Sequence, residues 1–200
     1  FIARLIAFDT TSRDSNLALI DFVRDYLDGW GIASDLYFDT DRRKADLFAT
    51  IGPDDRGGLM LSGHTDTVPV DGQAWDSDPF SVTQREGRLY ARGSSAMKSF
   101  IELALAHVPA LNETRLKTPL HFALSYDEEV GCLGVRDMLP IVSTVAPPLC
   151  CIVGEPTAMK VATGHKGKVF AHATCRGRSA HTAFAPEAVN AIHLACDLVG

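Results

Sequence analysis

The sequence predicts an α/β fold: a largely parallel, mixed sheet with helices on both faces. Short apolar runs rich in Val, Ile, Leu and Phe alternate with longer segments whose apolar residues recur at helical spacing. Near residues 160–168 this alternation gives way to a polar/apolar pattern with Gly turns, typical of antiparallel strands. We therefore predict a first domain over residues 1–163 and the beginning of an α+β domain over 164–200.

The N-terminal part begins with the apolar helical pattern FIARLIAF. A longer amphipathic helix is predicted over residues 14–30, with Asp14 or Ser15 as its cap and Gly31 as its stop. The chain starts within one helical pattern at residue 1 and stops within another at residue 200, so we expect both ends to be cut.

The remaining elements follow from short apolar runs between turn residues. Helices are expected over 97–111, where Pro109 would end the helix, and over 132–139. Residues 160–179 predict a half-exposed antiparallel hairpin, and residues 186–200 a helix. The predicted strands of the sheet are 34–38, 46–51, 59–63, 119–126 and 149–154, the last of them buried.

Composition excludes several classes of protein. A formal charge of −6, from 19 basic and 25 acidic residues, argues against nucleic acid as a partner, and the basic run 42–44 is typical of a solvated loop. No apolar run reaches the roughly 18 to 20 residues of a membrane span, and no leader is recognisable, so we expect a cytoplasmic protein without a membrane partner. The five cysteines contain no CxxC pair and are expected to be reduced and mostly buried.

Polar side chains of metal-binding type follow three of the predicted strands directly. The predicted strand 59–63 leads into His64 and Asp66. The strand 119–126 leads into residues 127–129 (Asp-Glu-Glu), and the strand 149–154 leads into Glu155. Taken singly, such a histidine is more often structural, and a Glu-Glu pair is more often a solvated loop. In open α/β sheets, however, working residues gather beyond the carboxyl ends of the strands, so the combination predicts a metal site.

The ligand types indicate the ion. Imidazole with carboxylate oxygens suits Zn²⁺ or a similar divalent metal, whereas an all-oxygen set would favour Mg²⁺ or Ca²⁺. Asp66 is placed to accept the second ring N–H of His64 and to fix its tautomer. Glu128 and Glu129 would point to opposite sides of an extended chain, so that one binds metal while the other acts as a base.

Six motifs, in their order along the chain, resemble those of the M20 metallopeptidases, the dinuclear zinc amidohydrolases. The resemblance covers essentially the whole chain. The last two motifs, with the intervening VATGHKGK, are most similar to the branch of that family that deacetylates N2-acetylornithine. The motifs are SGHTDTVPV (62–70), WDSDPF (75–80), LYARGSSAMKSF (89–100), DEEVGCLG (127–134), GEPT (154–157) and RGRSAHTAFAPEAVNAI (176–192).

The resemblance implies a role for each candidate residue. His64 and Glu155 would bind one zinc and Glu129 the second, while Glu128 would be the general base. His181 would reach into the partner subunit's site and stabilise the oxyanion. The family further implies a catalytic domain (1–163), a lid domain (164–200) that forms a homodimer, two Zn²⁺ per subunit that Co²⁺ can replace, and a small-molecule N-acyl amino acid as substrate.

One position departs from the family. The turn before the helix at residue 97 usually carries an aspartate that bridges the two metals, and this chain has Ala96 there, with Ser99 in place of a glycine. Ser94 and Ser95 are poor substitutes, because a neutral hydroxyl is a weak ligand for Zn²⁺. The family's last histidine ligand would lie beyond residue 200.

Two hypotheses follow from Ala96. In the first, the chain is part of an amidohydrolase impaired by Ala96, either an N2-acetylornithine deacetylase or, as runners-up, a succinyl-diaminopimelate desuccinylase or an M20 carboxypeptidase. In the second, it is a non-catalytic homologue that acts in assembly or ligand binding. The residues that bind the substrate stay unassigned.

Overall fold

The structure is a computed structural model, and it describes residues 1–143 and 147–200. The chain forms two compact units, Phe1–Lys160 and Val161–Gly200. Each unit is described by itself.

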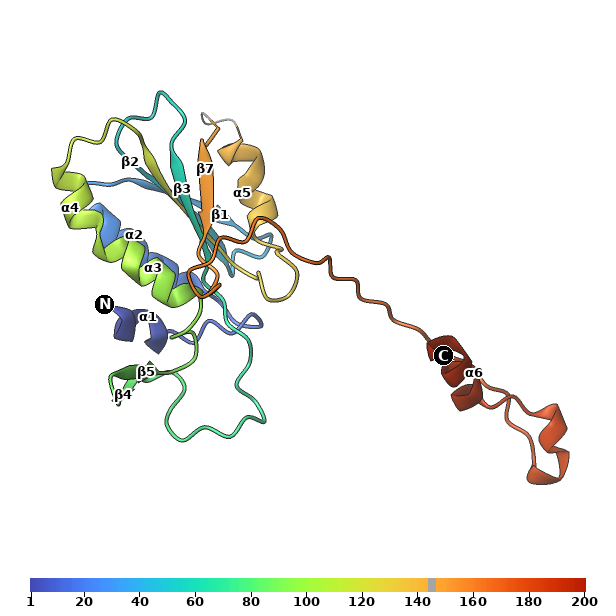
Figure 1. Cartoon of the computed structure of the whole chain (residues 1–200). Helices are drawn as coiled ribbons and strands as arrows, with labels where there is room; N and C mark the ends of the chain where they lie inside the picture. Colours follow the sequence, from blue (N-terminus) through green and yellow to red (C-terminus); the bar gives the residue numbers. More distant parts are fainter. Residues whose placement is uncertain (144–146) are drawn as a thin grey trace. The chain divides into compact units, whose positions relative to one another are not determined.

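The first unit is built on a five-stranded mixed sheet with strand order β1-β2-β6-β3-β7 (Figure 1). The strands β6, β3 and β7 are neighbours and run parallel. The strand β2 lies antiparallel to both of its neighbours, β1 and β6. In the parallel part, His64 at the end of β3 pairs with Ser125 at the end of β6. The strands are β1 (Ser34–Phe38), β2 (Ala45–Ile51), β3 (Leu59–His64), β6 (Leu120–Ser125) and β7 (Cys150–Val153).

Helices cover both faces of the sheet, which confirms the predicted fold class. On one face α1 (Ile2–Ala7), α2 (Leu17–Asp28), α3 (Met97–Ala106) and α4 (Val108–Glu113) enclose the main hydrophobic core. On the other face, α5 (Val135–Val142) packs Met138 and Val142 against Phe48, Met60 and Ala123 of the sheet. Leu47 and Phe48, neighbours on β2, belong to different cores, as the two-residue period of a strand requires.

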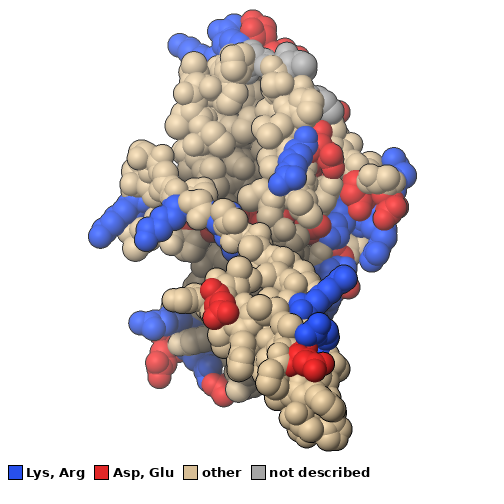
Figure 2. Space-filling model, turned by 90° about the vertical axis from the view of Figure 1, so that its right-hand side faces the viewer, with Lys and Arg blue, Asp and Glu red and all other residues tan. Residues whose placement is uncertain are grey.

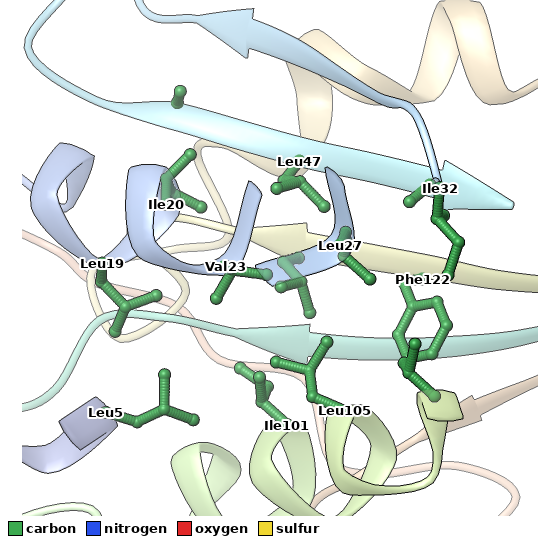
Figure 3. Packing of buried hydrophobic residues seen from close by; sticks show 14 of the residues in the cluster. Leu5, Leu19, Ile20, Val23, Leu27, Ile32, Leu47, Ile101, Leu105 and Phe122 are labelled. Atoms are coloured by element: carbon green, nitrogen blue, oxygen red, sulfur yellow. The ribbon is translucent and has the colours of Figure 1, made fainter. Parts of the chain in front are cut away.

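The main core explains why α2 and α3 lie on the sheet. Leu19, Ile20, Val23 and Leu27 of α2 recur at intervals of three and four residues or adjoin such positions, so they share one face of the helix, and all are fully buried (Figure 3). Ile101 and Leu105 of α3, Leu47 of β2 and Phe122 of β6 complete this core.

Several predicted boundaries are wrong in detail. Asn16 is the cap residue of α2, although the Ser15 hydroxyl accepts a hydrogen bond from the Leu17 amide. Pro109 does not end a helix. It lies in the first turn of α4, where its missing N–H costs no hydrogen bond, and α3 has already ended at Ala106.

A short hairpin escaped the prediction. The strands β4 (Thr83–Arg85) and β5 (Arg88–Tyr90) pair antiparallel across Glu86 and Gly87. Both turn residues have positive φ, 50° and 72°, as the tight hairpin turns that match strand twist require. The strands have only three residues each, too few for a recognisable alternation.

The expected burial of β7 and of the cysteines is wrong. All four residues of β7 are exposed, because β7 is the last strand in the sheet order. Cys150 and Cys151 lie on this strand, Cys132 and Cys196 are also exposed, and Cys175 is half-buried. All five are free thiols, as expected.

The second unit lacks the predicted hairpin. It contains a 3-10 helix (Thr182–Glu187) and α6 (Ala191–Val199), and a single bridge joins Arg178 to Val189. Residues 161–177 carry no strand. A two-stranded hairpin by itself is marginally stable in water at best. The predicted C-terminal helix is present but begins at Ala191.

Two observations concern nucleic acid and membranes, which the composition argues against as partners. On the face shown in Figure 2, lysine and arginine side chains are interspersed with aspartate and glutamate. Among the described residues, no helix is both long enough and apolar enough to cross a membrane.

The core predicts a contrast between two leucines of α3. Leu105 is fully buried, whereas Leu103 is 59% exposed. Leu105→Ala should lower the free energy of unfolding by about 2–5 kcal/mol, since it leaves a cavity, and Leu103→Ala by less than about 0.5 kcal/mol. Urea denaturation followed by circular dichroism measures both, and equal losses would contradict this packing.

Candidate metal centre

The candidate ligands come from the carboxyl ends of three neighbouring parallel strands. His64 is the last residue of β3, which lies between β6 and β7 in the sheet. Glu128 and Glu129 follow β6, and Glu155 follows β7. Because parallel strands end at the same edge, residues that are far apart in the sequence meet there.

The structure brings these side chains together. Ligand atoms of His64, Glu128 and Glu129 all lie within 4.8 Å of one another. His64 Nε2 lies 3.7 Å from Glu128 Oε2 and 3.5 Å from Glu155 Oε1. The imidazole is buried, whereas the glutamate side chains are 38% (Glu128) and 44% (Glu155) exposed, so the cluster opens to solvent on its acidic side.

The orientation of His64 leaves one ring nitrogen free for a ligand. Its Nδ1 lies 3.0 Å from the Asp66 carbonyl oxygen and 3.2 Å from Asp66 Oδ1, so an Nδ1–H donates to Asp66. The Nε2 lone pair then faces Glu128 and Glu155. Burial disfavours the charged imidazole, but the neighbouring carboxylates, Asp66 foremost, outweigh it and raise the pKa of His64.

Asp66 is the centre of a buried hydrogen-bond network. Besides His64, its carboxylate accepts the Ser12 hydroxyl at 2.6 Å and the backbone amides of Glu128 and Glu129 at 3.0 and 3.2 Å. Burial alone would raise the pKa of this carboxyl, but the hydrogen bonds from His64 and Ser12 outweigh burial and lower it. Asp66 therefore stays ionised and holds the loop after β6 beside the histidine.

Glu128 and Glu129 do not diverge as an extended chain would require. Asp127 before them has φ +53°, and residues 128–130 form a bend and turn, so both carboxylates approach His64. Burial, together with Glu128 and Asp66, outweighs His64 and raises the pKa of Glu129. A bound cation would favour the ionised carboxylates and so offset both their burial and their mutual repulsion.

Glu155 is positioned by the close approach of the backbone before it to α3. The Gly154 amide donates to the Ser62 carbonyl at 3.1 Å, which continues the pairing of β7 with β3. A Cβ at residue 154 would lie 2.0 to 2.5 Å from ring atoms of Phe100, so no larger residue fits without a shift. The GEPT motif thus begins with a glycine because a helix side chain occupies the adjacent space.

Ala96 and Lys98 mark the start of α3. Ala96 is the N-cap residue of the helix and provides no side-chain cap. Lys98, two residues later, is 1% exposed, and its ammonium donates to the Phe8 carbonyl at 2.7 Å. Burial lowers its pKa to about 8, against the opposing effect of Asp9 and Asp66. The sequence signal for Lys98 was a charged residue within an apolar helix, and it was missed.

His181 lies in the second unit, at the N-cap of the 3-10 helix. Its Nδ1 accepts a hydrogen bond from the Ala183 amide at 3.1 Å, so a neutral ring carries its proton on Nε2. The ring is exposed, and its Nε2–H is a hydrogen-bond donor.

The residues present fit a divalent metal ion. One imidazole nitrogen with a fixed tautomer and several carboxylate oxygens form the mixed nitrogen and oxygen set that divalent metals such as zinc accept. The Nδ1–H of the histidine is bound to an aspartate, as in many metal-binding histidines. His64, Glu128, Glu129 and Glu155 would hold the ion.

The fold and the cluster together define the class of protein: an α/β protein with a candidate divalent-metal centre at the carboxyl ends of parallel strands. Comparison with known proteins identifies the family within this class. Residues 60–200 match peptidase family M20/M25/M40, and the chain belongs to this family. Members of the family use divalent metal ions.

Two curated relatives are acetylornithine deacetylases. The protein from Pasteurella multocida (strain Pm70) is 37% identical over 187 residues, which cover 93% of this chain and 48% of the relative. The protein from Shigella sonnei (strain Ss046) is 38% identical over 159 residues, or 80% of this chain and 41% of the relative. The chain thus spans about half the length of the curated relatives it matches.

Solved structures agree on the fold. A tripeptidase from Staphylococcus aureus aligns with 99% of this chain and 54% of its own, with a TM-score of 0.66 and 17% identity. An M20 family metallo-carboxypeptidase from Sulfolobus solfataricus aligns with 76% of this chain and 36% of its own, with a TM-score of 0.63 and 21% identity.

The contact at Gly154 yields a testable prediction. Gly154→Ala should weaken the binding of Zn²⁺ by roughly 10- to 100-fold, because the new methyl group displaces Glu155 from His64. Isothermal titration calorimetry measures the affinity. The matched control is Gly164→Ala, where a Cβ meets nothing within 4 Å. Equal affinity of the native chain and Gly154→Ala would contradict this positioning.

A second buried carboxylate lies beside the loop. Asp46 on β2 is fully buried, and its Oδ1 accepts the Tyr126 amide at 3.1 Å, while its Oδ2 has no hydrogen-bond partner among the described residues. Burial raises the pKa of Asp46 to about 7, despite the hydrogen bond from Tyr126. Its folded pKa therefore exceeds its unfolded value, so its contribution to stability is complete below about pH 4 and is lost as the pH rises through about 7.

Asp46→Asn should remove this pH dependence. The amide keeps the acceptor for Tyr126 but never ionises, so at pH 8 the variant should be more stable than the native chain by roughly 1 to 4 kcal/mol. The difference should vanish as the pH falls toward 4. Denaturation curves between pH 4 and 8 measure it, with Asp35→Asn on the exposed side of β1 as control. A constant difference across this range would refute the assignment.

Proposed function

We propose that the protein is a zinc-dependent amidohydrolase that removes the acyl group from an N-acyl amino acid, with N2-acetylornithine as its substrate and ornithine and acetate as products. The observation that carries this proposal is the convergence of His64, Glu128, Glu129 and Glu155 on one edge of the sheet. Family membership and the deacetylase relatives support the reaction type and the substrate.

The proposal assigns a role to each residue. His64 and Glu155 hold one zinc ion and Glu129 the second, and Asp66 orients His64. Glu128 is the general base. Its Oε2 lies 3.7 Å from His64 Nε2, close enough to contact a water held between the metal ligands.

The chemistry then follows from the residues. When bound, the metal ions act as Lewis acids that make the water more acidic and polarise the amide carbonyl. Glu128 takes a proton from the water as the water oxygen attacks the amide carbonyl carbon. Glu128 then gives this proton to the amide nitrogen as the C–N bond breaks and the amine leaves. Partial exposure of Glu128 lets the substrate reach it, while Asp66 keeps the loop fixed during the proton transfer.

The second unit has a proposed part in the same reaction. Residues 164–200 would belong to a lid domain that forms a homodimer, and residues 1–163 to the catalytic domain. His181 would donate its Nε2–H to the oxyanion that develops on the substrate in a partner subunit, since its Nδ1 already accepts the Ala183 amide. The same proposal places the protein in the cytoplasm.

Ala96 limits this activity. It occupies the N-cap of α3, and Phe100 in the first turn of this helix lies against Gly154, the residue before Glu155. The first turn of α3 therefore borders the site. Without a carboxylate at this position, the second zinc has fewer anionic ligands and the repulsion between the two cations is less well offset.

Ala96 also favours a second candidate function. A homologue that has lost the bridging aspartate could serve in assembly or ligand binding without catalysis. Hydrolysis of N2-acetylornithine by the zinc-loaded native protein would exclude this alternative. Desuccinylation of succinyl-diaminopimelate, or carboxypeptidase activity, would replace the proposed substrate and keep the metal chemistry.

Two substitutions at position 96 test the proposal. Ala96→Asp and Ala96→Asn both supply a side-chain cap for α3, worth about 0.5–2 kcal/mol of stability, but only aspartate adds an anionic oxygen. Ala96→Asp should raise the zinc content toward two ions per chain and increase the hydrolysis of N2-acetylornithine, while Ala96→Asn should change neither. Metal analysis and an amine-release assay measure these quantities. Unchanged zinc content and hydrolysis in Ala96→Asp would contradict the proposed site.

A further inference from the structure

Lys44 connects two segments that frame the candidate metal centre. Its ammonium donates to Asp127 Oδ1 at 2.6 Å and Oδ2 at 2.7 Å, and also to the backbone carbonyl of Ser12. The side chains of Lys44 and Asp127 are only 13% and 11% exposed. Lys44 is therefore not part of a solvated basic loop, contrary to the expectation from the sequence. A pair so shielded from water is screened much less by salt than an exposed ion pair.

The network around Lys44 closes on the loop that carries the glutamates. Ser12 contacts the two residues that hold this loop. The Ser12 hydroxyl donates a hydrogen bond to Asp66, and the Ser12 carbonyl accepts one from Lys44. Asp66 in turn accepts the amides of Glu128 and Glu129. The loop is thus held at its backbone by Asp66 and at its first side chain by Lys44.

The backbone at Asp127 shows why this second anchor is needed. Its φ of +53° lies in the left-handed region, which L-residues adopt rarely and keep only where the surroundings hold them. This turn directs both Glu128 and Glu129 toward His64. If Asp127 were released, the loop could relax to an extended path, and successive side chains would then point to opposite sides.

We propose that Lys44 is a positioning residue of the metal centre: by holding the carboxylate of Asp127, it keeps Glu128 and Glu129 within reach of a metal bound at His64. Lys44 acts through Asp127 and touches none of the proposed ligands itself. The inference rests on the proposed function, since it assumes that these residues bind a divalent metal.

Zinc binding and folding, measured separately, test this role. Lys44→Met keeps most of the length of the side chain and removes its charge, and Lys44→Arg keeps the charge. The matched control is Lys117→Met, which removes the same charge from an exposed position. Calorimetric titration with Zn²⁺ is carried out at a temperature where circular dichroism shows every variant to be folded, and unfolding midpoints are recorded without metal.

We expect Lys44→Met to weaken Zn²⁺ binding by roughly 10- to 100-fold, as is typical for the loss of a residue that orients metal ligands. Lys44→Arg should recover part of this loss, and Lys117→Met should bind as the native chain does. A merely structural role would lower the unfolding midpoint of Lys44→Met and leave the affinity of the folded protein unchanged, which would overturn the inference.

A further variant covers the case in which Lys44→Met does not fold. Lys44→Met combined with Asp127→Asn leaves no unpaired buried charge, so it should fold and still bind Zn²⁺ more weakly than the native chain. Native affinity in this double variant would overturn the positioning role. Absence of Zn²⁺ binding by the native chain would overturn the proposed function itself, so the two failures are distinguishable.

Discussion

The buried carboxylate of Asp66 is the constraint on which the candidate site depends. It accepts hydrogen bonds from His64, from Ser12 and from the amides of Glu128 and Glu129, which belong to three separate segments of the chain. A buried charge is tolerated only when such partners compensate for the loss of water. Asp66 therefore fixes the tautomer of the histidine and the path of the glutamate loop together.

The sheet makes this arrangement possible. Because β6, β3 and β7 are parallel neighbours, their carboxyl ends deliver one ligand set to one edge. Close packing sets the finer placement: Gly154 lets Glu155 approach past Phe100, and the left-handed turn at Asp127 brings two consecutive glutamates to the same side. The main core on one face and the smaller core under α5 hold these strands in register.

Charge balance links the site to its surroundings. Carboxylates predominate around His64, and two lysines counter them from outside the ligand set: Lys44 pairs with Asp127, and Lys98 lies buried near Asp66. Ala96, at the N-cap of α3, contributes no charge to this balance. We therefore expect the metal affinity of the candidate site to depend also on residues that cannot themselves bind metal, because these residues affect how closely the acidic side chains approach one another.

The sequence by itself determined the class of fold, the order of most elements and the identity of the candidate ligands, because apolar periodicity and strand-end positions are local properties. It could not show that Lys44, in an apparently solvated basic run, pairs with Asp127, or that Glu128 and Glu129 converge. Nor could it show that β7 and its cysteines are exposed or that residues 161–177 form no hairpin. Those outcomes depend on contacts between distant segments and on which surfaces find a partner, and only the tertiary structure decides them.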